Sequence, residues 1–124
     1  MKSQLSAGFR LKLLHVARQS LENFLENGKR IQFPTESREL LEKRAVFVTL
    51  RKRENGDLRG CIGQSKPRYP LIEAVAKTAI SSAVDDTRFP SLTLDELPDL
   101  LIEINVLSPL AHQNLKMLRL GNTA

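Results

Sequence analysis

One short segment combines a nucleophilic side chain with a cation and two glycines: Leu58-Arg59-Gly60-Cys61-Ile62-Gly63. In an extended strand the Cα atoms of Arg59 and Cys61 lie roughly 6.5–7 Å apart, and both side chains point to the same face. A cation at that distance favours the thiolate, which is the reactive form of cysteine. The spacing therefore indicates a nucleophilic or redox thiol at Cys61, with Arg59 stabilising it or binding an anion.

A purely structural interpretation of the same segment stays open. Cysteine is among the residue types most often buried, and it packs like a small apolar side chain. Gly60 and Gly63 mark a bend or a close approach of the backbone, which serves either a ligand or a helix. We therefore treat both glycines as candidate binding residues and the thiol as the candidate reactive group.

The hydrophobic register predicts which face of a sheet carries Cys61. Residues 45–50 and 58–63 are strand-like runs on either side of Asn55-Gly56, which is a strong hairpin signal. A two-residue loop would mix polar and apolar side chains on both faces. A three-residue loop over 54–56, with a bulge at Gly56, separates them. We therefore predict the three-residue loop.

With this register, one face of the hairpin is aliphatic and the other is mostly polar. The aliphatic face would be covered by a helix and contains Val46, Val48, Leu50, Leu58 and Ile62. The other face contains Phe47, Thr49, Arg51, Arg59 and Cys61. Glu103 and Asn105 join it if their strand belongs to the same sheet. Thr49 and Arg51 are therefore candidate binding residues, and Glu103 is a candidate acid or base.

Apolar periodicity predicts the elements that hold these residues. Steps of three and four residues predict helices over 5–27 and 71–84, and a short helix over 36–43 with Leu40 and Leu41 inward. Strict alternation over 100–107 predicts a strand with one buried face.

The predicted elements define the fold class and the number of domains. They indicate an α+β fold, with a mostly antiparallel sheet centred on the hairpin 45–63 and helices packed on one face. A chain of 124 residues fits a single core, so we expect one domain over residues 1–124.

Metal and cofactor chemistry finds no support in the sequence. His15 falls in the first predicted helix, and His112 falls in a stretch with little pattern, so neither forms a zinc-binding spacing with the single cysteine. There is no P-loop and no glycine-rich dinucleotide motif, and one cysteine cannot hold an iron–sulfur centre. We expect no cofactor and no metal.

The charge is unevenly distributed. The net charge is +5, but residues 43–68 contain eight Lys or Arg and two acids, whereas residues 69–103 contain two and seven. Such a basic stretch is usually solvated surface, and it is also typical of sites for nucleic acid or another anionic partner. The single cysteine and the lack of a signal-like or membrane-spanning apolar run lead us to expect a cytoplasmic protein.

Four ordered blocks of the sequence resemble the AMMECR-one domain family, also called protein A of the AmmeMemoRadiSam set. The most specific block is the six-residue segment 58–63. The others are the strand 45–50, the segment Asp86-Thr87-Arg88-Phe89-Pro90, and the strand with its following proline at 102–109. Because these blocks span residues 45–109 in the family's order, chance similarity is a poor explanation.

The resemblance implies several properties that the residues alone do not give. It implies an intracellular α+β protein that acts with Memo-like and radical SAM proteins. It places site residues at Arg59, Gly60, Cys61 and Gly63, at Asp86 and Arg88, and more weakly at Glu103. Members of the family continue beyond the strand that ends near Pro109, so we hypothesise that this chain is C-terminally truncated.

Two functions follow from the sequence. One is an enzyme-like pocket centred on Cys61. The alternative is a non-catalytic module that binds nucleic acid or an acidic protein through residues 43–68. The scarcity of aromatic residues, 5% of the chain, counts against the stacking contacts of single-strand binding.

Overall fold

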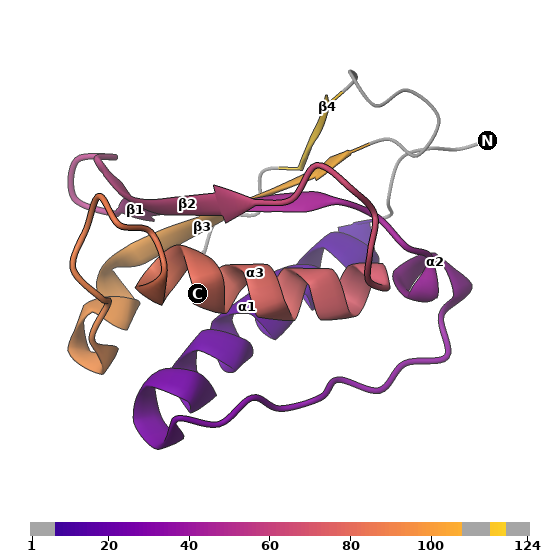
Figure 1. The fold of residues 1–124 in the computed structure, drawn as a ribbon, viewed down its shortest axis with the longest axis horizontal. Coiled ribbons are helices and arrows are strands. Elements are labelled where there is room, and N and C mark those ends of the chain that lie inside the picture. Colours follow the sequence, from indigo (N-terminus) through magenta and orange to yellow (C-terminus); the bar gives the residue numbers. More distant parts are fainter. Residues whose placement is uncertain (1–6, 108–114, 119–124) are drawn as a thin grey trace.

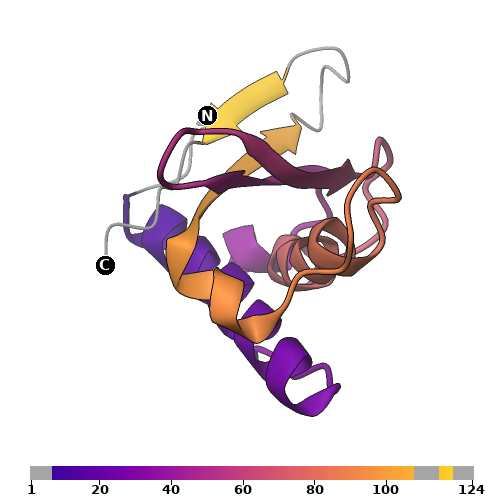
Figure 2. The same cartoon turned by 90° about the vertical axis from the view of Figure 1, so that its left-hand side faces the viewer.

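The computed structural model describes residues 7–107 and the backbone of residues 115–118. Its four strands form one antiparallel sheet in the order β2-β1-β3-β4. Two long helices pack against one face of that sheet (Figures 1 and 2), which confirms the α+β class. The elements in chain order are α1 (Ala7–Asn27), α2 (Arg38–Leu41), β1 (Val46–Lys52), β2 (Leu58–Gly63), α3 (Leu71–Val84), the 3-10 helix η1 (Leu94–Asp99), β3 (Leu100–Leu107) and β4 (Leu115–Leu118).

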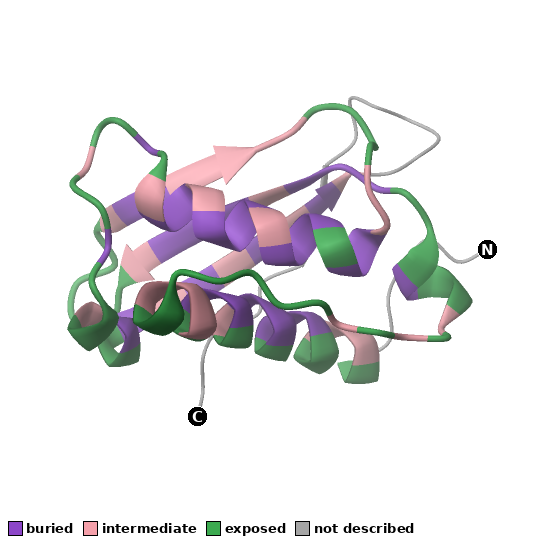
Figure 3. Cartoon of the chain, turned by 60° about the horizontal axis from the view of Figure 1, so that its bottom comes forward, coloured by how far each residue is buried: buried purple, intermediate pink, exposed green. Residues whose placement is uncertain are grey.

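The core lies between the sheet and the helices α1 and α3. Alternate residues of β3 are buried along its whole length, as a strand with one covered face requires. The apolar residues Val48, Leu50, Ile102 and Ile104 are completely buried in the two central strands. The buried sides of both helices face this layer (Figure 3), so the predicted aliphatic face is the core face of the sheet.

The two long helices match the prediction closely. The predicted helix over 71–84 is α3, and the one over 5–27 is α1, whose expected first two residues lie outside the described part of the chain. Gly28 follows α1 with a φ of 72°, a left-handed conformation that suits glycine at a helix end. No helix in the described ranges is both long and apolar enough to cross a membrane.

The short helix α2 corrects one prediction. Leu40 is buried as expected, but Leu41 is 48% exposed. The helix has only four residues, and consecutive residues of an α-helix point about 100° apart because one turn takes 3.6 residues. A single turn therefore directs only one of the two leucines into the core.

The hairpin confirms the predicted register at Cys61 but not the predicted loop. Thr49 pairs with Cys61 and Val48 with Ile62, as expected. However, the Lys52 amide donates to the Asp57 carbonyl, so the loop contains the four residues 53–56, with Gly56 at a φ of 79°. A β-bulge then shifts the register between Leu50 and Arg51, because Leu50 pairs with Gly60 and Arg51 with Leu58. The extra residue is Arg59.

Candidate functional site

Cys61 lies in the middle of β2, which is an edge strand of the sheet. Its thiol is half-buried, and its Sγ atom lies 3.2 Å from Oγ1 of Thr49 on β1. Thr49 itself is only 6% exposed. The two side chains are direct cross-strand neighbours and lie on the face away from the helices, because Val48 and Leu50 face the core. The predicted grouping of Thr49 with Cys61 is therefore present in the structure.

The outer edge of β2 is covered at Cys61 by the segment that follows α3. The Cys61 amide donates to Oδ2 of Asp86 at 2.9 Å, and the Arg88 guanidinium donates to both carboxylate oxygens of Asp86 at 3.0 and 2.8 Å. Asp86 is buried, whereas the Arg88 side chain is 58% exposed. Hydrogen bonds from Arg88 and from the Cys61 amide hold the pKa of the Asp86 carboxyl well below its usual range.

Arg88 is the cation that lies next to Cys61. Its Nη2 atom is 3.5 Å from the Cys61 carbonyl oxygen, so its positive charge lies beside the residue that bears the thiol. The hydrogen bond to Asp86 raises the pKa of Arg88 further above its already high value. Arg88 thus remains positively charged while part of its guanidinium stays accessible to solvent.

Arg59 does not take the place predicted for it. The bulge redirects its side chain, as bulges commonly do, and its Nε and Nη2 atoms donate to the Glu96 carboxylate at 2.9 and 3.1 Å. Its Nη1 atom donates to the Pro90 carbonyl at 2.9 Å. Arg59 is 6% exposed, so it connects β2 to the segment before β3. The prediction that the Arg59 side chain lies beside the thiol was wrong, because a strict two-residue alternation of side chains does not allow for the bulge.

Glu96 is the ion-pair partner of Arg59, and the sequence analysis did not predict this pair. Burial opposes its charged form, but hydrogen bonds from Arg59 and from the Thr93 amide and hydroxyl outweigh that effect, so the pKa of Glu96 is lowered. The capping-box spacing from Thr93 to Glu96 was the available signal. This spacing marks the start of η1 and gives no indication of the second role of the carboxylate, its ion pair with Arg59.

Glu103 and Arg51 lie further across the same face. Glu103 pairs with Thr49 from the β3 side, so Cys61, Thr49 and Glu103 form a row across three strands. Adjacent strands are about 4.8 Å apart, which separates the Cα atoms of Cys61 and Glu103 by roughly twice that distance. Arg51 pairs with Glu103 at 3.4 Å and also donates to the Gly56 carbonyl. Both residues are on the predicted face, but Thr49 lies between them and the thiol.

The two glycines of the segment have packing partners. A Cβ at Gly60 would overlap the carbonyl oxygen of Ser82 on α3, and one at Gly63 would overlap the ring of Phe47, its cross-strand partner. The sequence left two explanations for a close backbone approach at Gly60, a ligand or a helix. In the structure it is a helix, α3, that approaches. These contacts account for both glycines without a ligand, so their predicted binding role gains no support from the geometry.

Ser82 ties α3 into the hairpin. The Ile62 amide donates to its Oγ at 3.0 Å, and that hydroxyl donates to the Val48 carbonyl at 2.7 Å. Val48 and Ile62 face each other in register, so the helix hydroxyl takes part in their pairing. A small polar residue on an apolar helix stripe was the only sequence signal for this contact.

Within the described ranges, no three His, Cys, Asp or Glu side chains are grouped closely enough to hold a metal ion. His15 is exposed on α1, and His112 lies outside the described residues. A cavity of about 540 Å³ is lined by α1, α3 and the connector between α1 and α2. Cys61 does not line it, so the thiol lies on a sheet face rather than in this cavity.

A half-buried thiol on an antiparallel sheet, fixed at the sheet edge by an Asp–Arg pair and backed by two helices, defines an α+β domain with a single-cysteine site. The chain belongs to the AMMECR1 family, whose sequence profile matches residues 14–123. The signature segment and the residues that clamp it all fall inside that match.

Two relatives from Pyrococcus species are about twice as long as this chain. The chain is 48% identical over 101 residues to Protein PH0010 of Pyrococcus horikoshii and 46% identical to Protein PYRAB00100 of Pyrococcus abyssi, covering 78% of this chain and 49% of each relative. The crystal structure of the uncharacterized protein PH0010 superposes with a TM-score of 0.79 at 44% identity, over 85% of this chain and 54% of that one. The chain thus spans about half the length of the curated relatives it matches.

Proposed function

We propose that Cys61 is the nucleophile of an enzyme-like site on the face of the sheet away from α1 and α3. The observation that carries this proposal is the 3.2 Å contact between the Cys61 thiol and the buried Thr49 hydroxyl. A hydroxyl at this distance can donate to a thiolate, and hydrogen bonds to the charged form favour that form. Arg88 adds a permanent positive charge beside the same residue. The Thr49 hydroxyl and the Arg88 guanidinium thus place a hydrogen-bond donor and a positive charge beside the proposed nucleophile.

The proposed substrate carries an electrophilic centre and a negative charge. The exposed part of the Arg88 guanidinium would hold the anionic group, since arginine presents several donors in a fixed fork. The Cys61 sulfur would form a bond to an electrophilic carbonyl carbon, while the C=O π electrons move onto the oxygen and the thiol proton is taken up by that oxygen. Glu103 is too far across the sheet to act on the thiol directly, so as an acid or base it would act on a substrate group that lies over Thr49.

Alkylation kinetics test the proposal with no signal from other thiols, because Cys61 is the only cysteine of the chain. Iodoacetamide modification at pH 7, followed by intact mass, is compared between the native chain and the same chain unfolded in urea. We expect the native thiol to react several-fold faster, and Arg88→Ala to remove most of that advantage. Lys66→Ala, which removes an exposed charge elsewhere, is the matched control and should react like the wild type. A native rate no higher than the unfolded rate contradicts the proposal.

The proposal includes the setting implied by the family resemblance, namely a cytoplasmic protein acting with Memo-like and radical SAM proteins. Affinity purification of the tagged chain from its own cells, with quantification of both protein classes, tests this part. Enrichment over a tagged unrelated domain is expected. Equal recovery of both classes with the unrelated domain argues against these partners.

The alternative, a nucleic-acid or protein binding module using residues 43–68, has less support. Arg44 and Arg59 are only 6% exposed, and Arg44 donates to the Leu107 carbonyl at 3.0 Å. Arg51 is paired with Glu103. Several cations of the basic stretch are therefore engaged within the fold. Binding to mixed RNA that weakens steeply with salt would revive this alternative.

A further inference from the structure

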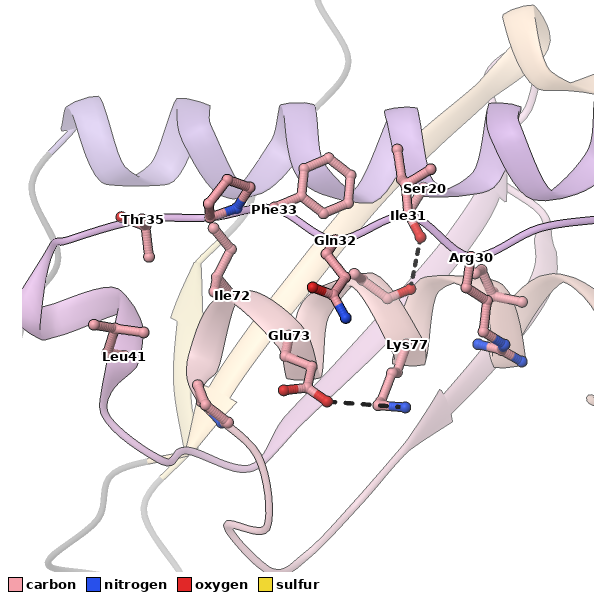
Figure 4. Close-up of a pocket in the computed structure, with 14 residues that line it drawn as sticks. Ser20, Arg30, Ile31, Gln32, Phe33, Thr35, Leu41, Ile72, Glu73 and Lys77 are labelled. Atoms are coloured by element: carbon pink, nitrogen blue, oxygen red, sulfur yellow. Dashed lines mark hydrogen bonds and ion pairs between the residues drawn. The ribbon is translucent and has the colours of Figure 1, made fainter.

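A second feature of the molecule lies on the opposite side of α3 from the sheet. The connector between α1 and α2 runs as a stretched segment past α3 (Figures 1 and 4), and the cavity of about 540 Å³ lies between them. This volume is within the range of ligand-binding sites. None of the proposed thiol-site residues lines it, so any role for it is separate from that of Cys61.

The connector offers main-chain groups that the fold does not use. Residues 30–34 form no helix, strand or turn, and within the described chain neither the N–H groups of residues 30–33 nor the C=O groups of residues 30–34 form a hydrogen bond. Every residue from 30 to 34 except Phe33 is exposed. An exposed stretch with unpaired N–H and C=O groups is a template on which another extended chain can add as a strand.

Exposed apolar surface is concentrated along the same groove. Only four large apolar side chains of the described residues are exposed, and two of them, Ile31 and Leu41, line the cavity. The α3 side adds the buried residues Ile72, Ala76 and Ile80. Ile31 and Leu41 therefore provide the exposed apolar surface of the groove, and such surface accepts side chains of a docked peptide.

Charge distinguishes the two ends of the groove. Arg30 and Lys77 lie toward one end, whereas Leu41 and Ile72 lie toward the other (Figure 4). Glu73 is 3.9 Å from Lys77 and offsets one of the two positive charges. The lining residues therefore keep a net charge of +1 at the polar end, which complements a carboxylate.

We propose that this groove docks an extended acidic peptide segment of a partner protein. The peptide backbone pairs with residues 30–34, and one apolar side chain packs against Ile31 and Leu41. An acidic side chain, placed further along, meets Arg30 and Lys77. Main-chain pairing supplies affinity and the alternate side chains supply specificity, as in other strand-addition complexes.

Selection from a library of random octapeptides displayed on phage tests the proposal with the chain as it exists. We expect enriched peptides that alternate apolar and acidic residues. Measured by fluorescence anisotropy, their affinity should fall at least tenfold for the double variant Arg30→Glu with Lys77→Glu. The double variant Lys52→Glu with Lys66→Glu makes the same charge change outside the groove and should bind like the wild type. Failure to enrich any peptide, or equal binding by both double variants, overturns the proposal.

Chemically modified peptides give a second measurement that needs no protein variant. N-methylation of alternate residues of an enriched peptide removes the amide donors of one edge at a time. Methylation of one edge should abolish binding, and methylation of the other should leave it within about twofold. Equal sensitivity of both edges contradicts strand addition. Binding should also be unchanged in Cys61→Ser, which separates this groove from the thiol site.

Discussion

Replacement of Gly60 by alanine is the sharpest test of how α3 and β2 fit together. A Cβ at this position would lie well inside contact distance of the Ser82 carbonyl oxygen and 3.2 Å from its carbonyl carbon. Carbon–oxygen contacts normally stop at about 3.3 Å, so α3 has to move away from the strand by roughly 1 Å. The obstacle is backbone in the last turn of α3, which cannot rotate aside as a side chain can.

The expected cost follows from two opposing effects. Overpacking of this kind costs about 1–3 kcal/mol, and the shift also stretches the two hydrogen bonds of the Ser82 hydroxyl, each worth about 1 kcal/mol. Alanine also restricts the unfolded chain more than glycine does, and this offsets about 0.4–1 kcal/mol of the destabilisation. We expect Gly60→Ala to lower the free energy of unfolding by about 2 kcal/mol. At roughly 4 °C per kcal/mol for a chain of this length, the Tm should fall by about 8 °C.

Urea unfolding followed by circular dichroism, together with calorimetric melting, measures both quantities. Gly63→Ala is the matched control, because its obstacle is the Phe47 ring, a side chain that can be shortened. The double variant Gly63→Ala with Phe47→Leu should recover most of the stability lost by Gly63→Ala. A Gly60→Ala chain as stable as the wild type would refute the close approach of Ser82 to the strand.

Three further predictions concern the polar contacts around the thiol. Arg59→Ala should lower the free energy of unfolding in urea by about 2 kcal/mol, because Glu96 and the Pro90 carbonyl lose their partner; an unchanged midpoint would show that this ion pair is not formed. The pKa values of Asp86 and Glu96 are lowered in the folded chain, so the unfolded chain takes up protons first as the pH falls. The contribution of these two lowered pKa values to the free energy of unfolding is complete above about pH 4 and is lost as the pH falls below it. Asp86→Asn should therefore flatten the decline of the urea midpoint between pH 6 and pH 3, and an equally steep decline would contradict that reasoning. Thr49→Val keeps the shape but removes the hydroxyl, so it should slow Cys61 alkylation at pH 7 without lowering the Tm by more than a few degrees; an unaltered alkylation rate would exclude a role for the hydroxyl.

The parts of the fold that depend on regular periods could be predicted from the sequence. The helices over 7–27 and 71–84 and the face that carries Cys61 follow from steps of 3.6 and 2 residues, since a slip by one residue would bury polar side chains. The position of Arg59 could not be predicted, because a bulge interrupts the period at that residue. Leu41 was misplaced because a four-residue helix is too short for a periodic pattern.

The site itself was only partly predictable for a related reason. Asp86 and Arg88 came from the family resemblance and lie at Cys61, but the hydrogen bond from the Cys61 amide to Asp86 joins residues 25 positions apart. Ser82 likewise contacts Ile62 across 20 positions. Long-range polar contacts of this kind depend on how elements pack, and a single sequence contains no direct signal for them.

The hydroxyl of Ser82 has a consequence for how the hairpin opens. The Ile62 amide is bonded to a helix side chain and not only to its neighbouring strand, so its hydrogen exchange requires α3 to separate from β2. An edge strand would ordinarily fray and exchange early. Here the Ile62 amide should exchange together with the buried turns of α3, so the strand that bears Cys61 opens only when that helix separates from it.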